Sequence, residues 1–123
     1  MPPKISNAEW EVMNVVWQQH PLTAAKVYEA LPDHNVWAQK TVNTFLARLV
    51  EKGVLRVEKD GTVNLYRPKL RREECVAGER EDFLRRVYQG SAGSLLMHFC
   101  ESADLTEAEI RELQRLLRKK KGE

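Results

Sequence analysis

A polar stretch in the middle of the chain carries the side chains best suited to specific recognition. It contains an amide, two hydroxyls and two cations, on Lys40, Thr41, Asn43, Thr44 and Arg48. These are the groups that hydrogen-bond to base edges in the major groove of DNA. On a helix, a turn of about 100° per residue puts most of them opposite Val42. The stretch is therefore interpreted as a DNA-reading face, with an ordinary solvated helix face as the alternative.

Three residues outside this stretch are candidates for contacts with the phosphate backbone. Trp37 precedes the polar stretch, and its indole N–H either donates to a phosphate or packs over the edge of the core. Lys59 and Arg67 belong to a segment that resembles a β-hairpin. Contacts of this kind supply position and affinity rather than choice of sequence.

The sequence shows no residue pattern typical of a catalytic site or of a metal site. The sequence has no nucleophile elbow and no phosphate-binding loop. Cys75 and Cys100 are far apart, and His20, His34 and His98 lack the spacing of metal ligands. We expect no enzyme, no cofactor and no metal site, and we expect both cysteines to be small apolar packing residues.

Two helices are predicted before the polar stretch. Ser6 and Glu9 form a capping box, so a helix should run from there to about His20. Its apolar face comprises Trp10, Met13, Val16 and Trp17. Thr23 should cap a second helix from Ala24 to Leu31, followed by a loop at 32–35. The expected buried side of this helix comprises Ala25, Val27, Tyr28 and Leu31.

The polar stretch itself belongs to a third predicted helix, from about Ala38 to Lys52. Its apolar residues recur at helical spacing, at Val42, Phe45, Leu46, Leu49 and Val50. Gly53 permits the turn that ends it. Two alternating runs, 54–58 and 62–67, flank an Asp-Gly turn and predict a hairpin.

Helical patterns return after the hairpin. Helices are expected over about 72–88, around 94–100, and after a second capping box formed by Thr106 and Glu109. Their apolar stripes are the expected dimerisation residues: Leu84, Val87, Leu95, Leu96, Phe99, Ile110, Leu113, Leu116 and Leu117.

The order of these elements indicates the fold class. Three helices followed by a two-stranded hairpin is the order of a winged helix-turn-helix domain, so a mainly α fold with one small hairpin is expected. The DNA-binding domain should cover 1–70 and a helical dimerisation domain 71–123. So small a tail buries little apolar surface alone, and we therefore expect a homodimer.

Composition agrees with a small globular protein and excludes a membrane span. The chain has 123 residues, 42% of them hydrophobic, and a net charge of +2. Residues 1–70 hold nine Lys/Arg against seven Asp/Glu, while 71–123 hold eleven of each. No apolar run approaches the roughly 18 residues of a membrane span. We expect a cytoplasmic protein that does not insert into membranes.

Several of these segments together resemble one known family. Residues 7–13 with Trp17, the run from Lys40 to Leu49 followed by 51–53, and residues 94–99 and 105–110 with Leu113 are similar to the penicillinase-repressor (BlaI/MecI/CopY) family. The likeness covers nearly the whole chain in the same order. It implies a homodimeric repressor of a palindromic operator with TACA/TGTA-type half-sites, controlling antibiotic resistance or copper export genes.

The resemblance also implies a route of control, from which this sequence departs. In the β-lactamase branch a membrane sensor with a protease domain triggers cleavage of an Asn-Phe bond in the dimerisation part. The matching pair here is His98-Phe99, and the Cys-x-Cys pairs of the copper branch are absent from the sequence. Cleavage at His98-Phe99 therefore stays open.

Two other functions remain alternatives. A winged helix can serve as a protein–protein interaction module, for which apolar or acidic residues would be expected on the exposed face of the third helix. A repressor that senses a small ligand between its domains is also compatible with the sequence. Salt dependence separates the first alternative from DNA binding, because phosphate contacts release counterions.

Overall fold

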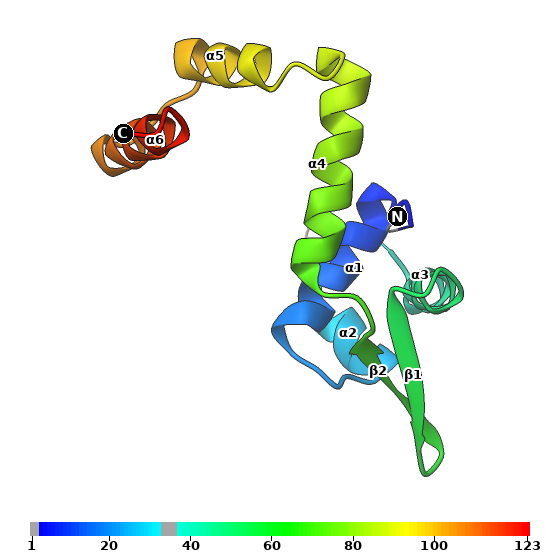
Figure 1. Cartoon of the computed structure of the whole chain (residues 1–123). Helices are drawn as coiled ribbons and strands as arrows, with labels where there is room; N and C mark the ends of the chain where they lie inside the picture. The colour runs from blue at the N-terminus through cyan, green and yellow to red at the C-terminus, as the bar shows by residue number, and fades with distance from the viewer. Residues whose placement is uncertain (1–2, 33–36) are drawn as a thin grey trace. The chain divides into compact units, whose positions relative to one another are not determined.

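The computed structural model describes residues 3–32 and 37–123. In these residues, six helices and one antiparallel hairpin follow in the predicted order (Figure 1). They are α1 (Asn7–Gln18), α2 (Ala24–Ala30), α3 (Gln39–Glu51), β1 (Leu55–Asp60), β2 (Val63–Pro68), α4 (Arg72–Tyr88), α5 (Ala92–Ser102) and α6 (Glu107–Lys120). The predicted fold class, a winged helix-turn-helix followed by a helical region, is confirmed.

Contacts within the chain divide it into two compact units. The first unit is Met1–Glu81 and the second is Asp82–Glu123. The first contains α1, α2, α3, the hairpin and most of α4, and the second contains the end of α4 with α5 and α6. The division of functions between residues 1–70 and 71–123 stays a prediction.

Capping hydrogen bonds lie at the starts of α1 and α2, where the sequence predicts them. The Ser6 hydroxyl accepts from the Glu9 N–H at 3.2 Å, and the Glu9 carboxylate accepts from the Ser6 N–H at 2.8 Å. Thr23 caps α2 by accepting from the Lys26 N–H at 3.2 Å. Gly53, just beyond α3, has φ of +81°, the left-handed conformation that glycine adopts without strain.

One hydrophobic core lies inside the first unit. It is formed by the apolar faces of α1 and α3, the start of β1 and Cys75 of α4. The fully enclosed side chains include Val12, Met13, Val16, Val27, Val42, Leu46, Leu49 and Val54. In α2 the prediction is partly wrong. Val27 and Leu31 are buried, but Ala25 and Tyr28 are exposed, because so short a helix turns only a narrow face to the core.

The hairpin forms with the predicted Asp-Gly turn. Its register pairs Leu55 with Pro68 and Asp60 with Val63, and Gly61 in the turn has φ of +66°. Leu22 and Tyr66 exchange two backbone hydrogen bonds, which attach the base of the hairpin to the segment before α2. Figure 1 shows the turn of the hairpin extending away from the helices of this unit.

The second unit has helices but no interior. Gln89 and Gly90 have positive φ and end α4, and Ser91 then caps α5, which begins earlier than predicted. The Thr106–Glu109 capping box begins α6 as predicted. Across residues 82–123, all of which the structure describes, no side chain is buried within the single chain.

The two cysteines differ in environment. Cys75 is 3% exposed and packs in the core of the first unit, as predicted. Burial, with a smaller effect of the Glu74 charge, raises the pKa of its thiol. Cys100 is exposed on α5, so the prediction that it packs among apolar residues is wrong for the single chain. The predicted loop lies outside the described residues at 33–35.

Candidate nucleic-acid interface

One face of α3 is polar and exposed while the opposite face is enclosed. Val42, Leu46 and Leu49 have no exposed surface, so they fix the helix on the core. The predicted base-reading residues Lys40, Asn43, Thr44 and Arg48 are exposed on the other side, together with Ala47. Thr41 lies at the margin and is half-buried. The structure thus brings five of the predicted site residues together on one helix.

The first turn of α3 leaves backbone donors without a side-chain cap. Ala38 stands at the N-cap position and has no side-chain acceptor. The first backbone amides of a helix have no partner within it, and they carry the positive end of the helix dipole. Together with Lys40, this end of α3 is suited to an anion such as a backbone phosphate.

Trp37 packs against the core beside α3. Its ring meets the ring of Phe45 edge-on, with centroids 5.1 Å apart and planes at 75°. The residue is half-buried and belongs to the shell around the core. This contact agrees with the packing interpretation, and a phosphate contact of the indole N–H stays a prediction.

The hairpin separates its two predicted cations. Lys59 is exposed one pair from the turn, across from Asn64. Arg67 lies near the base, where its Nε donates to the Glu58 carboxylate at 3.1 Å. Lys59 is therefore free to meet a phosphate at the turn, whereas Arg67 is already held by an ion pair.

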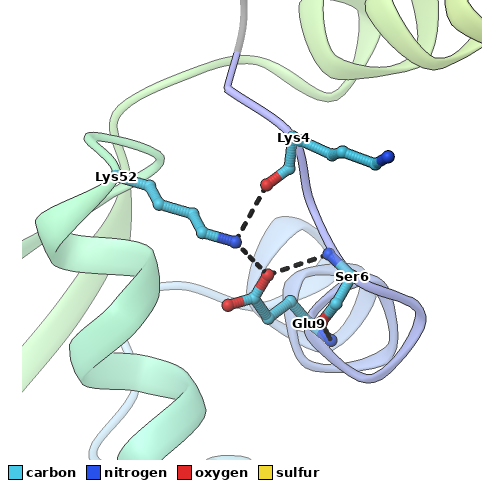
Figure 2. A network of polar contacts seen from close by, with 4 residues as sticks. All are labelled: Lys4, Ser6, Glu9 and Lys52. Atoms are coloured by element: carbon cyan, nitrogen blue, oxygen red, sulfur yellow. Dashed lines mark hydrogen bonds and ion pairs between the residues drawn. The ribbon is translucent and has the colours of Figure 1, made fainter.

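A buried carboxylate connects the start of α1 to the end of α3 (Figure 2). Lys52, the C-cap of α3, donates to the Glu9 carboxylate at 2.5 Å and to the Lys4 carbonyl at 2.8 Å. The same carboxylate accepts from the Ser6 N–H. Glu9 is 1% exposed, so its charge is compensated mainly by this one lysine.

These contacts determine the protonation of Glu9. Burial would raise the pKa of the Glu9 carboxyl, but the hydrogen bonds from Lys52 and Ser6 and the Lys52 charge together outweigh that effect. The pKa therefore lies below its ordinary value, and the carboxylate is charged at neutral pH. Sequence reasoning identified Glu9 only as a capping residue and missed Lys52, because their pairing is a tertiary contact.

The predicted dimerisation residues are half-buried or exposed in the single chain. Val87, Leu96, Phe99 and Leu117 are between 46% and 54% exposed. Met97, at 61%, is more exposed than any of them, although the helical stripe did not include it. His98 and Phe99, the pair matching the family's cleaved bond, lie within α5, and His98 Nδ1 is 2.7 Å from the Tyr88 hydroxyl.

The described residues contain neither a metal-binding cluster nor a membrane-spanning helix. Across 3–32 and 37–123, no group of three or more His, Cys, Asp or Glu side chains is placed to hold a metal ion. In the same ranges no helix is long and apolar enough to cross a membrane.

Three helices, a hairpin and an exposed polar helix face define a winged helix-turn-helix protein. The family model described as penicillinase repressor matches residues 5–119. The chain belongs to this family. It is 35% identical to the penicillinase repressor of Bacillus licheniformis, over 98% of this chain and 94% of that protein. It is 34% identical to the methicillin resistance regulatory protein MecI of Staphylococcus aureus strain N315, over 95% of each chain.

Solved structures agree with this assignment. The DNA-binding domain of the repressor BlaI has a TM-score of 0.54 and 36% identity, covering 60% of this chain and 90% of that one. The monomeric form of Bacillus licheniformis BlaI in complex with the blaP half-operator has a TM-score of 0.53 and 36% identity, with the same coverage. The resemblance stated from the sequence is thereby confirmed.

Proposed function

We propose that the protein is a homodimeric transcriptional repressor that binds a palindromic operator through α3. The exposed polar face of α3, fixed on the core by Val42, Leu46 and Leu49, carries the proposal. The relative that binds a half-operator has a similar domain at 36% identity. A helix held in this way can enter the major groove without exposing apolar surface.

The proposed contacts fall into two groups. Lys40, Asn43, Thr44 and Arg48 read base edges, with Thr41 beside them. Thr44 already donates its hydroxyl hydrogen to the Lys40 carbonyl at 3.2 Å, so toward a base it acts as an acceptor. Lys59 at the hairpin turn meets a phosphate, and Trp37 and Arg67 are weaker candidates because each already has a partner.

The second unit supplies the dimer. Its exposed apolar side chains cost free energy in water, and a second copy removes them from water in a two-fold arrangement. The predicted set is Leu84, Val87, Leu95, Leu96, Phe99, Ile110, Leu113, Leu116 and Leu117, to which we add Met97. Two linked reading domains then bind two half-sites with a high effective concentration.

The finer parts of the proposal concern chemistry and control. The protein acts as a binding protein in the cytoplasm, without enzymatic activity and without a cofactor. A sensor protease that cuts His98-Phe99 would separate the reading domains from the dimer. Because this bond lies inside α5 and proteases bind extended chain, α5 must unfold locally before such a cut.

Fluorescence anisotropy of a labelled duplex tests the proposal. A palindrome of TACA/TGTA half-sites should bind more tightly than its scrambled version, with affinity falling steeply as salt rises. Arg48→Ala and Lys40→Ala should each cost about 1–3 kcal/mol of palindrome binding if they contact bases. Arg80→Ala, an exposed cation of α4, is the matched control and should change little.

Two outcomes would contradict the proposal. If both Ala variants bound the palindrome as tightly as the unchanged protein, α3 would not be part of the DNA interface. Weak binding of both duplexes, with little dependence on salt, would favour the protein-interaction module instead.

A further inference from the structure

A broad hollow lies in the first unit, and of the residues proposed to contact the operator it includes Arg67 alone. The end of α1, the base of the hairpin and the segment leading into α4 line this open hollow, which has a volume of about 900 Å³. No residue of α3 and no residue of the hairpin turn lines it. Small-molecule sites in proteins have volumes of about 300–1,000 Å³.

The lining of the hollow is strongly cationic. Its charged residues are Arg56, Arg67, Lys69, Arg71, Arg72 and Glu73. Arg56 and Arg67 are paired across the hairpin, and both contact Glu58, at 3.4 and 3.1 Å. Arg71 pairs with Glu74 at 3.0 Å. Even with Glu58 and Glu74 counted beside Glu73, an excess of two positive charges remains.

Two of these cations have no anionic partner in the part of the chain that the structure describes. They are Lys69, which lies between β2 and α4, and Arg72, the first residue of α4, and both are exposed. Since no carboxylate neutralises them, they can offer charge-assisted hydrogen bonds to a ligand. Such bonds are stronger than those between neutral groups.

Buried contacts hold the walls of the hollow in place. The Trp17 indole N–H donates to the Leu70 carbonyl at 3.1 Å, which fixes the segment carrying Lys69 against α1. Backbone bonds from Lys69 and Leu70 to the Val54 carbonyl, at 2.8 and 3.2 Å, fix it against the start of the hairpin. The cations therefore stand on a preorganised frame, which lowers the entropy cost of binding.

We propose that this hollow is a binding site for a small molecule bearing two or more carboxylate or phosphate groups. A hollow of this volume is large enough for a small anionic ligand. Arg56 comes from β1 and the other four cations from one continuous run, 67–72, so a ligand with two anionic groups can contact both segments at once. Binding here does not depend on the proposed function, and it would give the protein a chemical input separate from DNA.

The test is an NMR titration of the full-length protein. Citrate and inorganic pyrophosphate are the probes, and chloride keeps the ionic strength constant. We expect saturable shifts of the Trp17 indole signal and of the Lys69 and Arg72 amide signals. The double variant Lys69→Gln/Arg72→Gln should weaken binding by about tenfold or more, since it removes both cations that have no carboxylate partner among the described residues.

A second double variant controls for general electrostatics. Lys26→Gln/Arg80→Gln removes the same charge from exposed positions that do not line the hollow, and it should leave the dissociation constants nearly unchanged. Equal weakening in both double variants would overturn the proposal, as would shifts that fail to saturate. So would shifts of the same signals with a scrambled duplex but not with citrate or pyrophosphate, because the hollow would then contact the DNA backbone.

Discussion

Both units of the chain contain amphipathic helices, but only the first unit buries their apolar faces in a core. In the first unit, the apolar faces of α1 and α3 meet in one closed core. In the second, residues 82–123 bury no side chain completely. The first unit therefore has the closed core of a complete domain, whereas the second leaves its apolar faces exposed to be covered by the proposed dimer.

The helices α3 and α6 differ in this respect. Along α3, Val42, Leu46 and Leu49 lie on one face and are fully enclosed. Along α6, Ile110 and Leu117 also lie on one face, yet they are 38% and 54% exposed. An apolar stripe shows that a helix must be covered, but whether its own chain or another copy covers it is decided by what else the chain supplies.

The largest expected effect comes from separating the two units. A fragment ending at Glu81 keeps the whole core, so it should fold as a monomer. Its affinity for the palindrome should fall by about 100- to 10,000-fold, because the linked second half-site is lost. Anisotropy and sedimentation measure both properties. A fragment that still dimerises would show that the first unit carries a dimer contact of its own.

The next largest effect is expected from shortening a core side chain, which should destabilise the first unit when the side chain belongs to that unit. Leu46→Ala should lower the free energy of unfolding by about 2–5 kcal/mol, since it opens a cavity in a closed core. Leu117→Ala should change the unfolding of the first unit by less than about 0.5 kcal/mol. All three tryptophans lie in the first unit, so their fluorescence in urea follows that unit alone. Equal losses in the two variants would argue against independent units.

A smaller effect is expected at the Glu9–Lys52 pair. Glu9→Gln removes the charge but keeps the shape, and should cost about 1–2 kcal/mol at neutral pH, within the range of single substitutions. The folded pKa of Glu9 lies below its ordinary value of 4.5, so its contribution is complete above that pH and is lost as pH falls through the folded pKa.

Urea unfolding at pH 7 and at pH 3 tests this pair. The difference between the unchanged protein and Glu9→Gln should shrink at the lower pH. Glu29→Gln, at an exposed site on α2, serves as the matched control. An equal difference at both pH values would show that the contact with Lys52 does not lower the pKa of Glu9.

The smallest effect expected concerns the two thiols. Cys75 is enclosed and the pKa of its thiol is raised, so a maleimide should label it only after unfolding. Cys100 should react readily in dilute protein and a few-fold more slowly once α5 lies in a dimer. Mass spectrometry over a concentration series reports both rates. Labelling of Cys100 that is independent of concentration would place it outside the interface.

Much of this structure could be predicted from local sequence. Both capping boxes, the Asp-Gly turn and the spacing from Val42 to Leu49 are short-range features, and each forms as expected. The exposed face of α3 followed directly from the position of its buried face. Where hydrogen bonds and periodicity lie within one helix or turn, sequence is sufficient.

The remaining features depend on contacts between distant segments. Tyr28 has helical spacing for burial but lies beyond the edge of the core at 39% exposure. The pairing of Lys52 with Glu9, and the position of Arg67 near the hairpin base, arise only when elements meet. The cationic hollow combines three elements that are separate in the sequence, so no local pattern indicates it.

The link between Glu9 and Lys52 also bears on how specificity could be transferred between relatives. The helix proposed to read DNA ends on a lysine whose partner lies in the first turn of α1. A chimaera that takes α3 from a relative, but not the residue that meets its C-cap, would carry the proposed base-reading side chains on a helix that lacks this contact. The part of the sequence that must be exchanged is therefore larger than α3 and includes the first turn of α1.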